Sequence, residues 1–249
     1  MQKTVLVTGA GRGIGAAIAR AAAQAGYSVA VNYARSKGAA EALVGEIRQQ
    51  GGEAVAIQGD VGREADVERL FKTVDEKYGR LDALVNNAGV IGPYGKLEAL
   101  KAKDVEQLLA INVTGALICA REAVKRMSTA HGGKGGVIVN ISSAATTLGS
   151  PNEFIAYAAS KGAINSMTIG LAKEVGHEGI RVNAVEPGLI ETEIHEAAGP
   201  PGRLGRLVPS VPLGGRAGTA EEVAGPVLFL MSDAASYMTG AIVRVGGGR

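Results

Sequence analysis

Short apolar segments alternate with longer amphipathic segments along the whole 249-residue chain. The apolar segments are rich in Val, Ile and Ala and lack a polar face, as expected for parallel strands that are buried on both sides of a sheet. Seven strands are predicted in this way, over residues 3–8, 28–33, 53–58, 81–86, 135–141, 180–185 and 241–245. Because strands and helices alternate, we predict one α/β domain over residues 1–249, a doubly wound sheet of seven parallel strands with helices on both faces.

The amphipathic segments predict helices over residues 16–25, 38–50, 64–78, 104–127 and 155–176, and a last helix that ends near Met231. Thr219 and Glu222 have the spacing of a capping box at the start of that last helix. The helix predicted over 104–127 carries Asn112 among apolar neighbours, where a buried amide needs hydrogen-bond partners. Gly115 nearby could permit a local irregularity.

Residues 189–217 differ in kind from the rest of the chain. They hold four of its eight prolines, repeated glycines and only weak helical periodicity. A long segment of this type is more often a functional lid than a linker, so we predict a substrate lid over about 189–217. His195 lies in this segment and could touch substrate, although a lone loop histidine is usually just solvated.

Composition and charge exclude several other classes of protein. Hydrophobic residues make up 46% of the chain and charged residues 20%, with an intermixed net charge of +2, which indicates a globular protein without a nucleic-acid or polybasic membrane surface. The three histidines show no metal-ligand spacing, and the single Cys119 lies in an apolar helical run that predicts a buried, inert thiol. No signal peptide is visible and no apolar run approaches the roughly 18 residues that span a bilayer, so we expect a soluble cytoplasmic protein without membrane partners.

The segment from Gly9 to Gly15 follows the first strand and precedes an Ala-rich helix. In that context a glycine turn predicts a phosphate site, because glycines let the backbone approach a pyrophosphate and the helix N-terminus offers free N–H groups. Two spacings can be read there, Gly11-x-Gly13-x-x-Ala16 and Thr8-Gly9-x-x-x-Gly13-x-Gly15. We favour the second, since Gly9 then stands at the strand end where the turn must begin; the alternative to both is a flexible loop.

The end of the second predicted strand indicates which dinucleotide binds. Sites for NAD place an acidic residue there, on the ribose 2′-hydroxyl, whereas this chain reads Asn32-Tyr-Ala-Arg-Ser-Lys37. Arg35, together with Arg12 in the glycine turn, could clamp a 2′-phosphate, and Ser36 could donate to it. We therefore predict NADP in preference to NAD, the alternative being that Arg35 and Lys37 only flank the next helix.

Further candidates follow the other predicted strands, at the carboxyl edge where an open α/β sheet binds ligands. Asp60 follows the third strand, and its carboxylate could accept from an adenine amino group or merely cap a turn. Small residues after the fourth strand would let a cofactor lie close to the chain, and two serines end the fifth. These residues are Asn87, Ala88, Gly89, Ser142 and Ser143.

Tyr157 and Lys161 lie one turn apart on the helix predicted over 155–176, so their side chains share a face. A free tyrosine has a pKa of about 10, and a nearby ammonium favours the phenolate and lowers that pKa toward the range where the group can exchange protons. The pair is a candidate acid/base unit, although a tyrosine and a lysine four residues apart also occur by chance on many amphipathic helices.

Together these motifs resemble the short-chain dehydrogenase/reductase family over essentially the whole chain. The resemblance rests on Thr8-Gly-Ala-Gly-Arg-Gly-Ile-Gly15, Asp60-Val61, Asn86-Asn-Ala-Gly89, Asn112, Ser143, Tyr157-x-x-x-Lys161 and Pro187-Gly188, in this order and spacing. Within the family the chain is similar to bacterial 3-oxoacyl-carrier-protein reductases and glucose-dehydrogenase-like members. The resemblance implies a Rossmann fold and an enzyme that interconverts a small carbonyl and an alcohol with NADP(H), without a metal.

The resemblance also implies roles for single residues. Tyr157 would be the general acid/base, Lys161 would hold the nicotinamide ribose and lower the pKa of Tyr157, and Ser143 would polarise the substrate oxygen. Asn112 would anchor a water that passes protons toward Lys161. The cofactor contacts predicted from the motifs and the resemblance together are Gly9, Arg12, Gly13, Ile14, Gly15, Asn32, Tyr33, Arg35, Ser36, Asp60, Val61, Asn87, Ala88, Gly89, Tyr157, Lys161, Pro187, Gly188, Ile190 and Thr192. Relatives of this kind suggest a homotetramer, with helices 104–127 and 155–176 packed between subunits.

One departure from the family pattern concerns residues 150–156, a segment about one residue longer than usual. It leaves Ser142 and Ser143 as alternatives for the active hydroxyl, and we choose Ser143 because residues 144–149 then align well. Substrate specificity would lie in residues 92–97, 144–156 and 189–215.

Three other functions compete with this prediction. A non-catalytic NADP-binding sensor or scaffold need not keep a complete set of Asn112, Ser143, Tyr157 and Lys161. A sugar-nucleotide epimerase of the same fold usually has a larger C-terminal lobe. An NAD-linked polyol or sugar dehydrogenase would differ in its cofactor.

Overall fold

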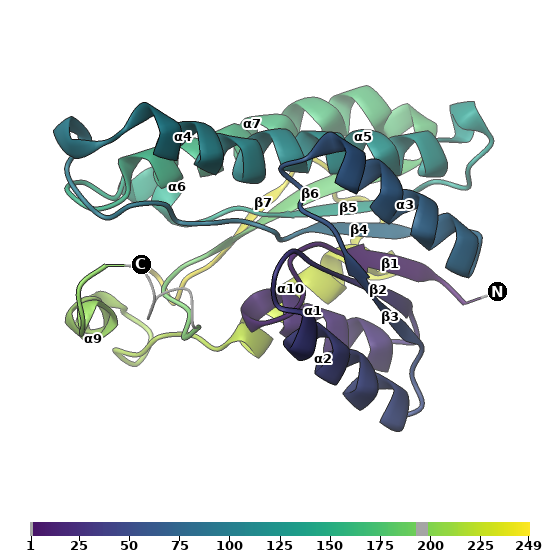
Figure 1. Ribbon diagram of the computed structural model, residues 1–249, viewed down its shortest axis with the longest axis horizontal. Helices are drawn as coiled ribbons and strands as arrows, with labels where there is room; N and C mark the ends of the chain where they lie inside the picture. Colours follow the sequence, from purple (N-terminus) through teal and green to yellow (C-terminus); the bar gives the residue numbers. More distant parts are fainter. Residues whose placement is uncertain (1, 193–198) are drawn as a thin grey trace.

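The computed structural model describes residues 2–192 and 199–249 and is built around one seven-stranded sheet (Figure 1). All neighbouring strands are parallel, in the order β3-β2-β1-β4-β5-β6-β7. The strands are β1 Thr4–Val7, β2 Ser28–Tyr33, β3 Ala54–Gln58, β4 Ala83–Asn86, β5 Gly136–Ile141, β6 Ile180–Pro187 and β7 Ile242–Val245. The predicted doubly wound sheet is confirmed, and the predicted strand ends differ from these by at most two residues.

The strand order reverses at β1, which pairs with β2 on one side and with β4 on the other. The loops that follow β1 and β4 therefore leave the same edge of the sheet and diverge from each other. In open α/β sheets a ligand binds in the crevice between such loops. The sheet topology alone thus selects the carboxyl ends of β1 and β4 as the place to look for a site.

Helices cover both faces of the sheet (Figure 1). One face carries α1 Gly13–Gln24, α2 Lys37–Gln49 and α10 Ala220–Met231, and the other carries α3 Glu64–Tyr78, α4 Ala102–Leu109, α5 Ala116–Met127 and α7 Ile155–Val175. Successive side chains of β1 are buried on opposite faces: Val5 and Val7 pack in the core with α1 and α10, and Leu6 packs with α3 and α5. Because each face has its own core, the strands are apolar at every position.

The helix predicted over 104–127 is interrupted by a π-helical turn, η2 Ala110–Gly115, which joins α4 to α5. Asn112 lies in this turn and is 1% exposed. Gly115 is packed so closely that a Cβ there would lie 2.7 Å from the carbonyl oxygen of Val61. The local irregularity expected near Gly115 is therefore confirmed, and π turns of this kind occur frequently at functional sites.

The continuous helical segment Ala102–Met127 is long and apolar enough to cross a membrane when judged by length and composition alone. The expectation was that no apolar run approaches the roughly 18 residues that span a bilayer, whereas this helix reaches that length when judged by its mean hydropathy. In the folded chain Cys119, Ala123 and Met127 are buried against the sheet, as in a core helix of a globular protein. Burial also raises the pKa of the Cys119 thiol to about 12, which fits the predicted inert thiol.

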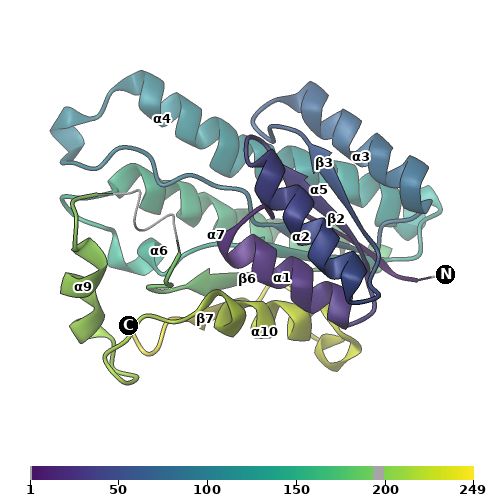
Figure 2. The same ribbon diagram turned by 60° about the horizontal axis from the view of Figure 1, so that its bottom comes forward.

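The remaining helical elements are short. They are η1 Leu97–Ala99, η3 Thr129–His131, α6 Ala145–Leu148, η4 Gly176–Glu178, α9 Arg203–Leu207, η5 Val208–Ser210 and η6 Asp233–Ala235. α9 and η5 lie in the segment 189–217, whose weak periodicity did not predict them, and an isolated bridge between Ile190 and Gly218 joins the ends of that segment. Figures 1 and 2 place α9 at the same end of the molecule as α4 and α6. His195, for which substrate contact and simple solvation were left as alternatives, lies outside the described residues.

The predicted capping box is present at the start of α10. The Thr219 hydroxyl accepts from the backbone N–H of Glu222 at 3.3 Å, and the Glu222 carboxylate accepts from the backbone N–H of Thr219 at 2.8 Å. The capping box stabilises the first turn of α10. α10 packs beside α1 on the same face of the sheet (Figures 1 and 2), so this cap also stabilises the position of α1.

Candidate active site

A cavity of about 730 Å³ opens at the carboxyl edge of the sheet, where the strand order reverses. The loops that follow each of the strands from β1 to β6 contribute to its wall. Every predicted cofactor contact lies in that wall, and so do Ser143, Tyr157 and Lys161. Asn112 is the predicted site residue that does not line the cavity.

The glycine turn between β1 and α1 is shaped by close contacts. Gly9 and Gly13 have left-handed φ angles of +61° and +54°. A Cβ at Gly9 would lie 2.8 Å from Ala88 Cα, and one at Gly15 would lie 2.5 Å from the side-chain nitrogen of Asn87. A Cβ at Gly11 would have no contact closer than 3.4 Å. The structure thus requires glycine at the positions of the longer spacing, Thr8-Gly9-x-x-x-Gly13-x-Gly15, and not at Gly11.

Buried polar side chains hold this turn against the neighbouring loops. The Thr8 hydroxyl accepts from the backbone N–H groups of Asn87 and Ala88, both at 3.0 Å, and the Asn87 amide donates to the carbonyls of Thr8 and Gly9 at 2.9 and 3.1 Å. Asn32 accepts from the N–H of Gly9 at 3.1 Å and donates to backbone carbonyls after β3. Asn32 and Asn87 therefore contribute to the site by fixing its backbone, and Thr8, which was not among the predicted site residues, does the same.

The cavity ends beside α2 in a wall that contains Tyr33, Arg35 and Ser36, with Arg12 from the glycine turn. Lys37 is not in that wall; its ammonium lies 3.7 Å from the Glu41 carboxylate on the exposed side of α2. The alternative that these cations only flank a helix thus describes Lys37 and not Arg35. The first turn of α1 borders the same cavity, and a helix N-terminus favours anions.

Asp60 occupies the loop after β3, where the predicted turn-capping role is observed and the predicted adenine contact stays a prediction. Its carboxylate accepts from the backbone N–H of Gly62 at 3.0 Å, as a turn-capping group does. The residue also lines the cavity, next to Val61. The carboxylate is therefore oriented by its own turn at the cavity wall.

Tyr157 and Lys161 share the inner face of α7, with the Lys161 ammonium 5.7 Å from the centre of the Tyr157 ring. The ammonium is buried and donates to the carbonyl oxygen of Ile141 at 2.8 Å. Burial lowers the pKa of Lys161 from 10.5 to about 8, because the charged form loses its hydration. The close spacing predicted from the sequence is confirmed.

The pKa of Tyr157, in contrast, is raised above its usual value of 10.0. The largest cause is burial, which disfavours the phenolate, and a hydrogen bond with the Ser143 hydroxyl opposes it. The prediction of a lowered pKa is therefore wrong for the chain by itself. The physical reason is the burial of the phenol, and Lys161, whose ammonium lies 5.7 Å from the ring centre and donates to the Ile141 carbonyl, does not offset it.

The two serines after β5 have different surroundings. The Ser142 hydroxyl is buried and donates to the backbone carbonyl of Lys161 at 3.2 Å. Ser143 is partly exposed, lines the cavity and accepts from the backbone N–H of Ala145 at 3.1 Å, and its hydroxyl lowers the pKa of Tyr157 against the effect of burial. Ser142 thus fixes the position of α7, whereas Ser143 presents its hydroxyl beside the phenol.

Asn112 acts from behind the cavity wall. Its amide accepts from the N–H of Val90 and donates to the Val90 carbonyl, both at 2.8 Å, and also donates to the Ser160 hydroxyl at 3.0 Å. A Cβ at Gly89 would lie 3.3 Å from the Asn112 side-chain oxygen and 3.5 Å from the Lys161 nitrogen. The π turn therefore ties the loop after β4 to α7 next to Lys161.

At the end of the cavity near α6 and α9, the wall contains residues that were predicted only as members of the specificity ranges, or were not predicted. Four of these lining residues fall within the predicted specificity ranges, namely Leu148, Phe154, Arg203 and Leu207. Three lie outside those ranges, namely Ile91, Gln107 and Arg249. No local pattern marks Gln107 or Arg249, because tertiary packing alone brings them to the wall. Among the described residues no three or more His, Cys, Asp or Glu side chains are grouped as they would be around a metal ion.

Known proteins are similar to this chain over almost its whole length. A family described as enoyl-(acyl carrier protein) reductase matches residues 9–249. The uncharacterized oxidoreductase YgfF of Escherichia coli is 49% identical, over 98% of this chain and 98% of its own length. A 3-oxoacyl-[acyl-carrier-protein] reductase of Synechocystis is 41% identical, over 99% of this chain and 96% of its own.

Solved structures with the same fold include two bacterial short-chain dehydrogenases. One from Burkholderia cenocepacia, in complex with NADP, has a TM-score of 0.90 and 34% identity, covering 99% of this chain and 97% of that one. A short-chain dehydrogenase/reductase from Serratia marcescens has a TM-score of 0.89 and 35% identity with the same coverage.

Proposed function

The chain belongs to the short-chain dehydrogenase/reductase family of NAD(P)-dependent oxidoreductases, and from that premise we propose that it interconverts a ketone or aldehyde and the corresponding alcohol with NADP(H). The observation that carries the proposal is that the cavity wall contains both Ser143 and Tyr157, whose hydroxyls are near enough for Ser143 to affect the pKa of Tyr157. A carbonyl oxygen placed beside both would meet one proton donor and one further hydrogen-bond donor.

The cavity fits a dinucleotide phosphate in size and in chemistry. Gly9 and Gly15 let the turn pack closely against the loop after β4, and the first turn of α1 offers its N–H groups to a pyrophosphate. Arg12, Arg35 and Ser36 supply the donors that a 2′-phosphate needs, and no carboxylate follows β2 to repel it. The structural similarity to an NADP complex and the sequence similarity to 3-oxoacyl-[acyl-carrier-protein] reductases further support NADP in preference to NAD.

The residues of the chain divide the chemistry between them. Because burial raises the pKa of Tyr157, its phenol is protonated at neutral pH and donates that proton to the carbonyl oxygen as negative charge develops there. Ser143 donates a hydrogen bond to the same oxygen. Lys161, charged below its pKa of about 8, stabilises the phenolate that remains. When bound, the nicotinamide supplies the hydride for the carbonyl carbon.

Other parts of the chain receive supporting roles. The cavity wall where the nicotinamide end would lie contains Pro187, Gly188, Ile190 and Thr192. The segment 189–217 acts as the substrate lid within the single domain. Asn112 keeps the loop after β4 and α7 in register near Lys161, and a water held there would connect Lys161 to solvent. We further propose a homotetramer and a cytoplasmic location, in line with the family resemblance.

A panel assay tests the function itself. NADPH consumption, followed by absorbance, is measured with short ketones, aldehydes and 3-oxoacyl thioesters, and NADP reduction with the corresponding alcohols. We expect turnover with at least one small carbonyl and a higher kcat/KM with NADPH than with NADH. Tight NADPH binding without turnover on any substrate would instead support the non-catalytic sensor or scaffold, and a preference for NADH with polyols would support the NAD-linked dehydrogenase.

A further inference from the structure

A buried ion pair lies at the substrate end of the cavity, between Glu153, which precedes α7, and Arg203 in α9. The guanidinium donates from Nε and Nη2 to one oxygen of the Glu153 carboxylate, at 2.9 and 2.5 Å. The side chains are 20% and 9% exposed, and both residues line the cavity. The pair joins two segments that are 50 residues apart and that both belong to the predicted specificity ranges.

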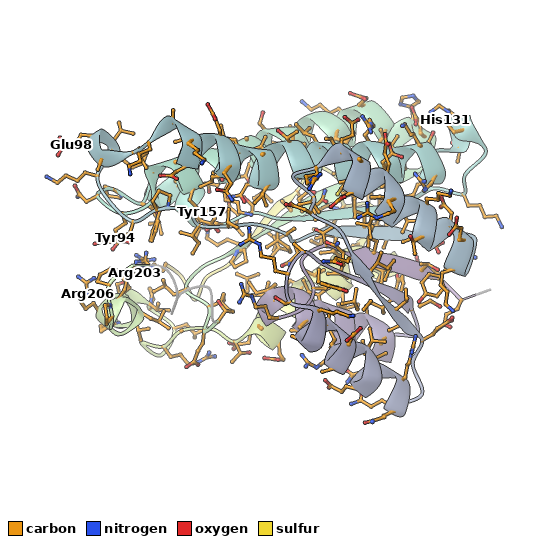
Figure 3. All side chains as sticks on the ribbon, in the orientation of Figure 1. Tyr94, Glu98, His131, Tyr157, Arg203 and Arg206 are labelled. Atoms are coloured by element: carbon orange, nitrogen blue, oxygen red, sulfur yellow. The ribbon has the colours of Figure 1, made fainter. Side chains whose placement is uncertain are left out.

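Aromatic rings hold this pair in place. The Arg203 guanidinium carbon lies 5.0 Å from the centre of the Phe154 ring, and the Tyr94 ring meets Phe154 edge to face at 5.5 Å. Gly199 packs between Arg203 and Tyr94, since a Cβ there would lie 3.0 and 3.2 Å from them. Figure 3 shows Tyr94, Arg203 and Tyr157 at the same end of the molecule, between α4 and α9.

The backbone before Glu153 adopts an unusual conformation. Ser150 and Asn152 have left-handed φ angles of +46° and +63°, and they are the described residues other than glycine with a positive φ. Such conformations persist where the surrounding structure enforces them, and they cluster at functional sites. This is also the segment for which the family resemblance implies a departure in length. The Glu153 carboxylate that follows it binds Arg203.

We propose that Glu153 is a specificity-determining residue: it neutralises Arg203 at the substrate end of the cavity and thereby selects uncharged carbonyl substrates over carboxylate-bearing ones. The proposal rests on the proposed carbonyl reduction and adds a substrate class to it. A buried guanidinium needs a negative partner, and Glu153 already provides it. A substrate carboxylate would have to approach Arg203 against the charge of Glu153, whereas a neutral ester or ketone would not.

The proposal predicts what happens when that partner is removed. In Glu153→Gln the Arg203 charge remains in the wall without a carboxylate, and an anionic substrate can supply one. Arg249 also lines the cavity, where its Nε donates to the Ser210 hydroxyl at 2.9 Å, but it is the same in both proteins and cancels in the comparison.

The experiment uses oxo acids of increasing chain length and their ethyl esters, which differ in charge at the same carbonyl. For each pair the ratio of kcat/KM for the ester to that for the acid is measured with NADPH. We expect the native protein to favour the ester, and Glu153→Gln to lower the ratio by about tenfold or more at the best chain length, the effect of one charge-assisted hydrogen bond. Arg203→Gln, which leaves Glu153 unneutralised, should move the ratio the other way.

Two exposed charged residues at the same end of the molecule provide matched controls. Glu98 and Arg206 are exposed, lie outside the cavity wall and are labelled in Figure 3 at the same end of the molecule as Arg203. Glu98→Gln and Arg206→Gln change the net charge by the same amounts as the two test variants. We expect both to leave the ester-to-acid ratio within about twofold, because exposed charges at a distance are screened.

A binding measurement separates this proposal from the proposed function. Calorimetric titration with the oxo acids in the presence of NADP needs no turnover, and we expect Glu153→Gln to bind them about tenfold more tightly than the native protein does. An unchanged ester-to-acid ratio and unchanged acid binding in Glu153→Gln, or an equal change in Glu98→Gln, would overturn the proposal. Failure of every carbonyl to react, with tighter acid binding retained, would overturn the proposed function and leave the charge assignment standing. If Glu153→Gln does not fold, a fall of the ratio in Arg203→Gln contradicts the proposal and a rise supports it.

Discussion

Each end of the cavity contains a buried cation, and the two cations differ in whether a carboxylate neutralises their charge. Lys161 is 4% exposed and donates to the backbone carbonyl of Ile141, and none of the ion pairs among the described residues involves it. Arg203 is 8% exposed and is bound to the Glu153 carboxylate through two nitrogens. The first charge is uncompensated by protein, and the second is neutralised.

In the proposed function, this difference in charge gives each end of the cavity its own role. An uncompensated ammonium beside Tyr157 remains available to cofactor hydroxyls and to a developing phenolate, and its cost appears as a pKa lowered to about 8. A neutralised guanidinium presents a wall without net charge to the substrate. The cofactor end is built from close backbone contacts around Gly9 and Gly15, while the substrate end is built from side-chain contacts that single substitutions can change.

The strongest test of this contrast is the pH dependence of stability. Between the folded pKa of about 8 and the unfolded value of 10.5, the unfolded lysine holds a proton that buried Lys161 has released. The free energy of unfolding therefore rises as the pH increases from about 8 to 10.5, and this gain is lost as the pH falls back toward 8. Relative to Lys161→Met, we expect the native free energy of unfolding to rise by about 3 kcal/mol from pH 8 to 10.5, measured by urea denaturation.

The same measurement on Arg203→Met provides the comparison. A guanidinium stays charged throughout that range, so we expect no slope relative to the native protein between pH 8 and 10.5. A flat difference for Lys161→Met, or an equal slope for both variants, would show that the two buried charges are not treated differently.

A second test compares two glycines that share a left-handed φ, +61° at Gly9 and +88° at Gly199. Alanine at either position costs about 1 kcal/mol of conformational strain. At Gly9 the new Cβ also meets the backbone of Ala88 at 2.8 Å, whereas at Gly199 it meets side-chain atoms of Arg203 and Tyr94 at 3.0 and 3.2 Å. We expect Gly9→Ala to lose about 2 to 3 kcal/mol of stability and to weaken NADPH binding. Gly199→Ala should lose about 1 kcal/mol and keep that affinity, and equal losses would contradict the contrast.

The smallest predicted effect concerns the choice of cofactor. Arg35→Ala removes one charge-assisted contact to a 2′-phosphate, worth about 2 kcal/mol, so the ratio of kcat/KM for NADPH to that for NADH should fall about 30-fold. Lys37→Ala is the matched control, because Lys37 points to Glu41 outside the cavity wall, and its ratio should change less than about threefold. Equal changes in both variants would remove Arg35 from the site.

The cofactor end could be predicted from the sequence because its determinants are local. A strand, a glycine turn and a helix follow one another within residues 3–25, and Tyr157 and Lys161 are one helical turn apart. Local spacing cannot give the direction of a side chain inside the fold, however. For this reason the raised pKa of Tyr157 was not foreseen, and neither was the commitment of the Asn32 amide to backbone groups.

The substrate end could not be predicted because its contacts are remote in sequence. Glu153 and Arg203 are 50 residues apart, and nothing in either local pattern pairs them. The five-residue α9 is too short to show a periodicity, and Gln107 reaches the wall through the tertiary packing of α4. The departure noted at residues 150–156 was the one local signal, and it falls on the loop that carries Glu153.

The central claim, that the phenol of Tyr157 is the proton donor in carbonyl reduction, is tested most directly by a single-turnover experiment on Tyr157→Phe. NADPH affinity is measured by fluorescence, and hydride transfer to a reactive carbonyl is measured by stopped-flow absorbance in the same samples. We predict an NADPH Kd within about threefold of the native value and a hydride-transfer rate lower by about 10³-fold or more, near the loss expected when a general acid is removed. A hydride-transfer rate within tenfold of the native rate, with NADPH bound normally, would contradict the account.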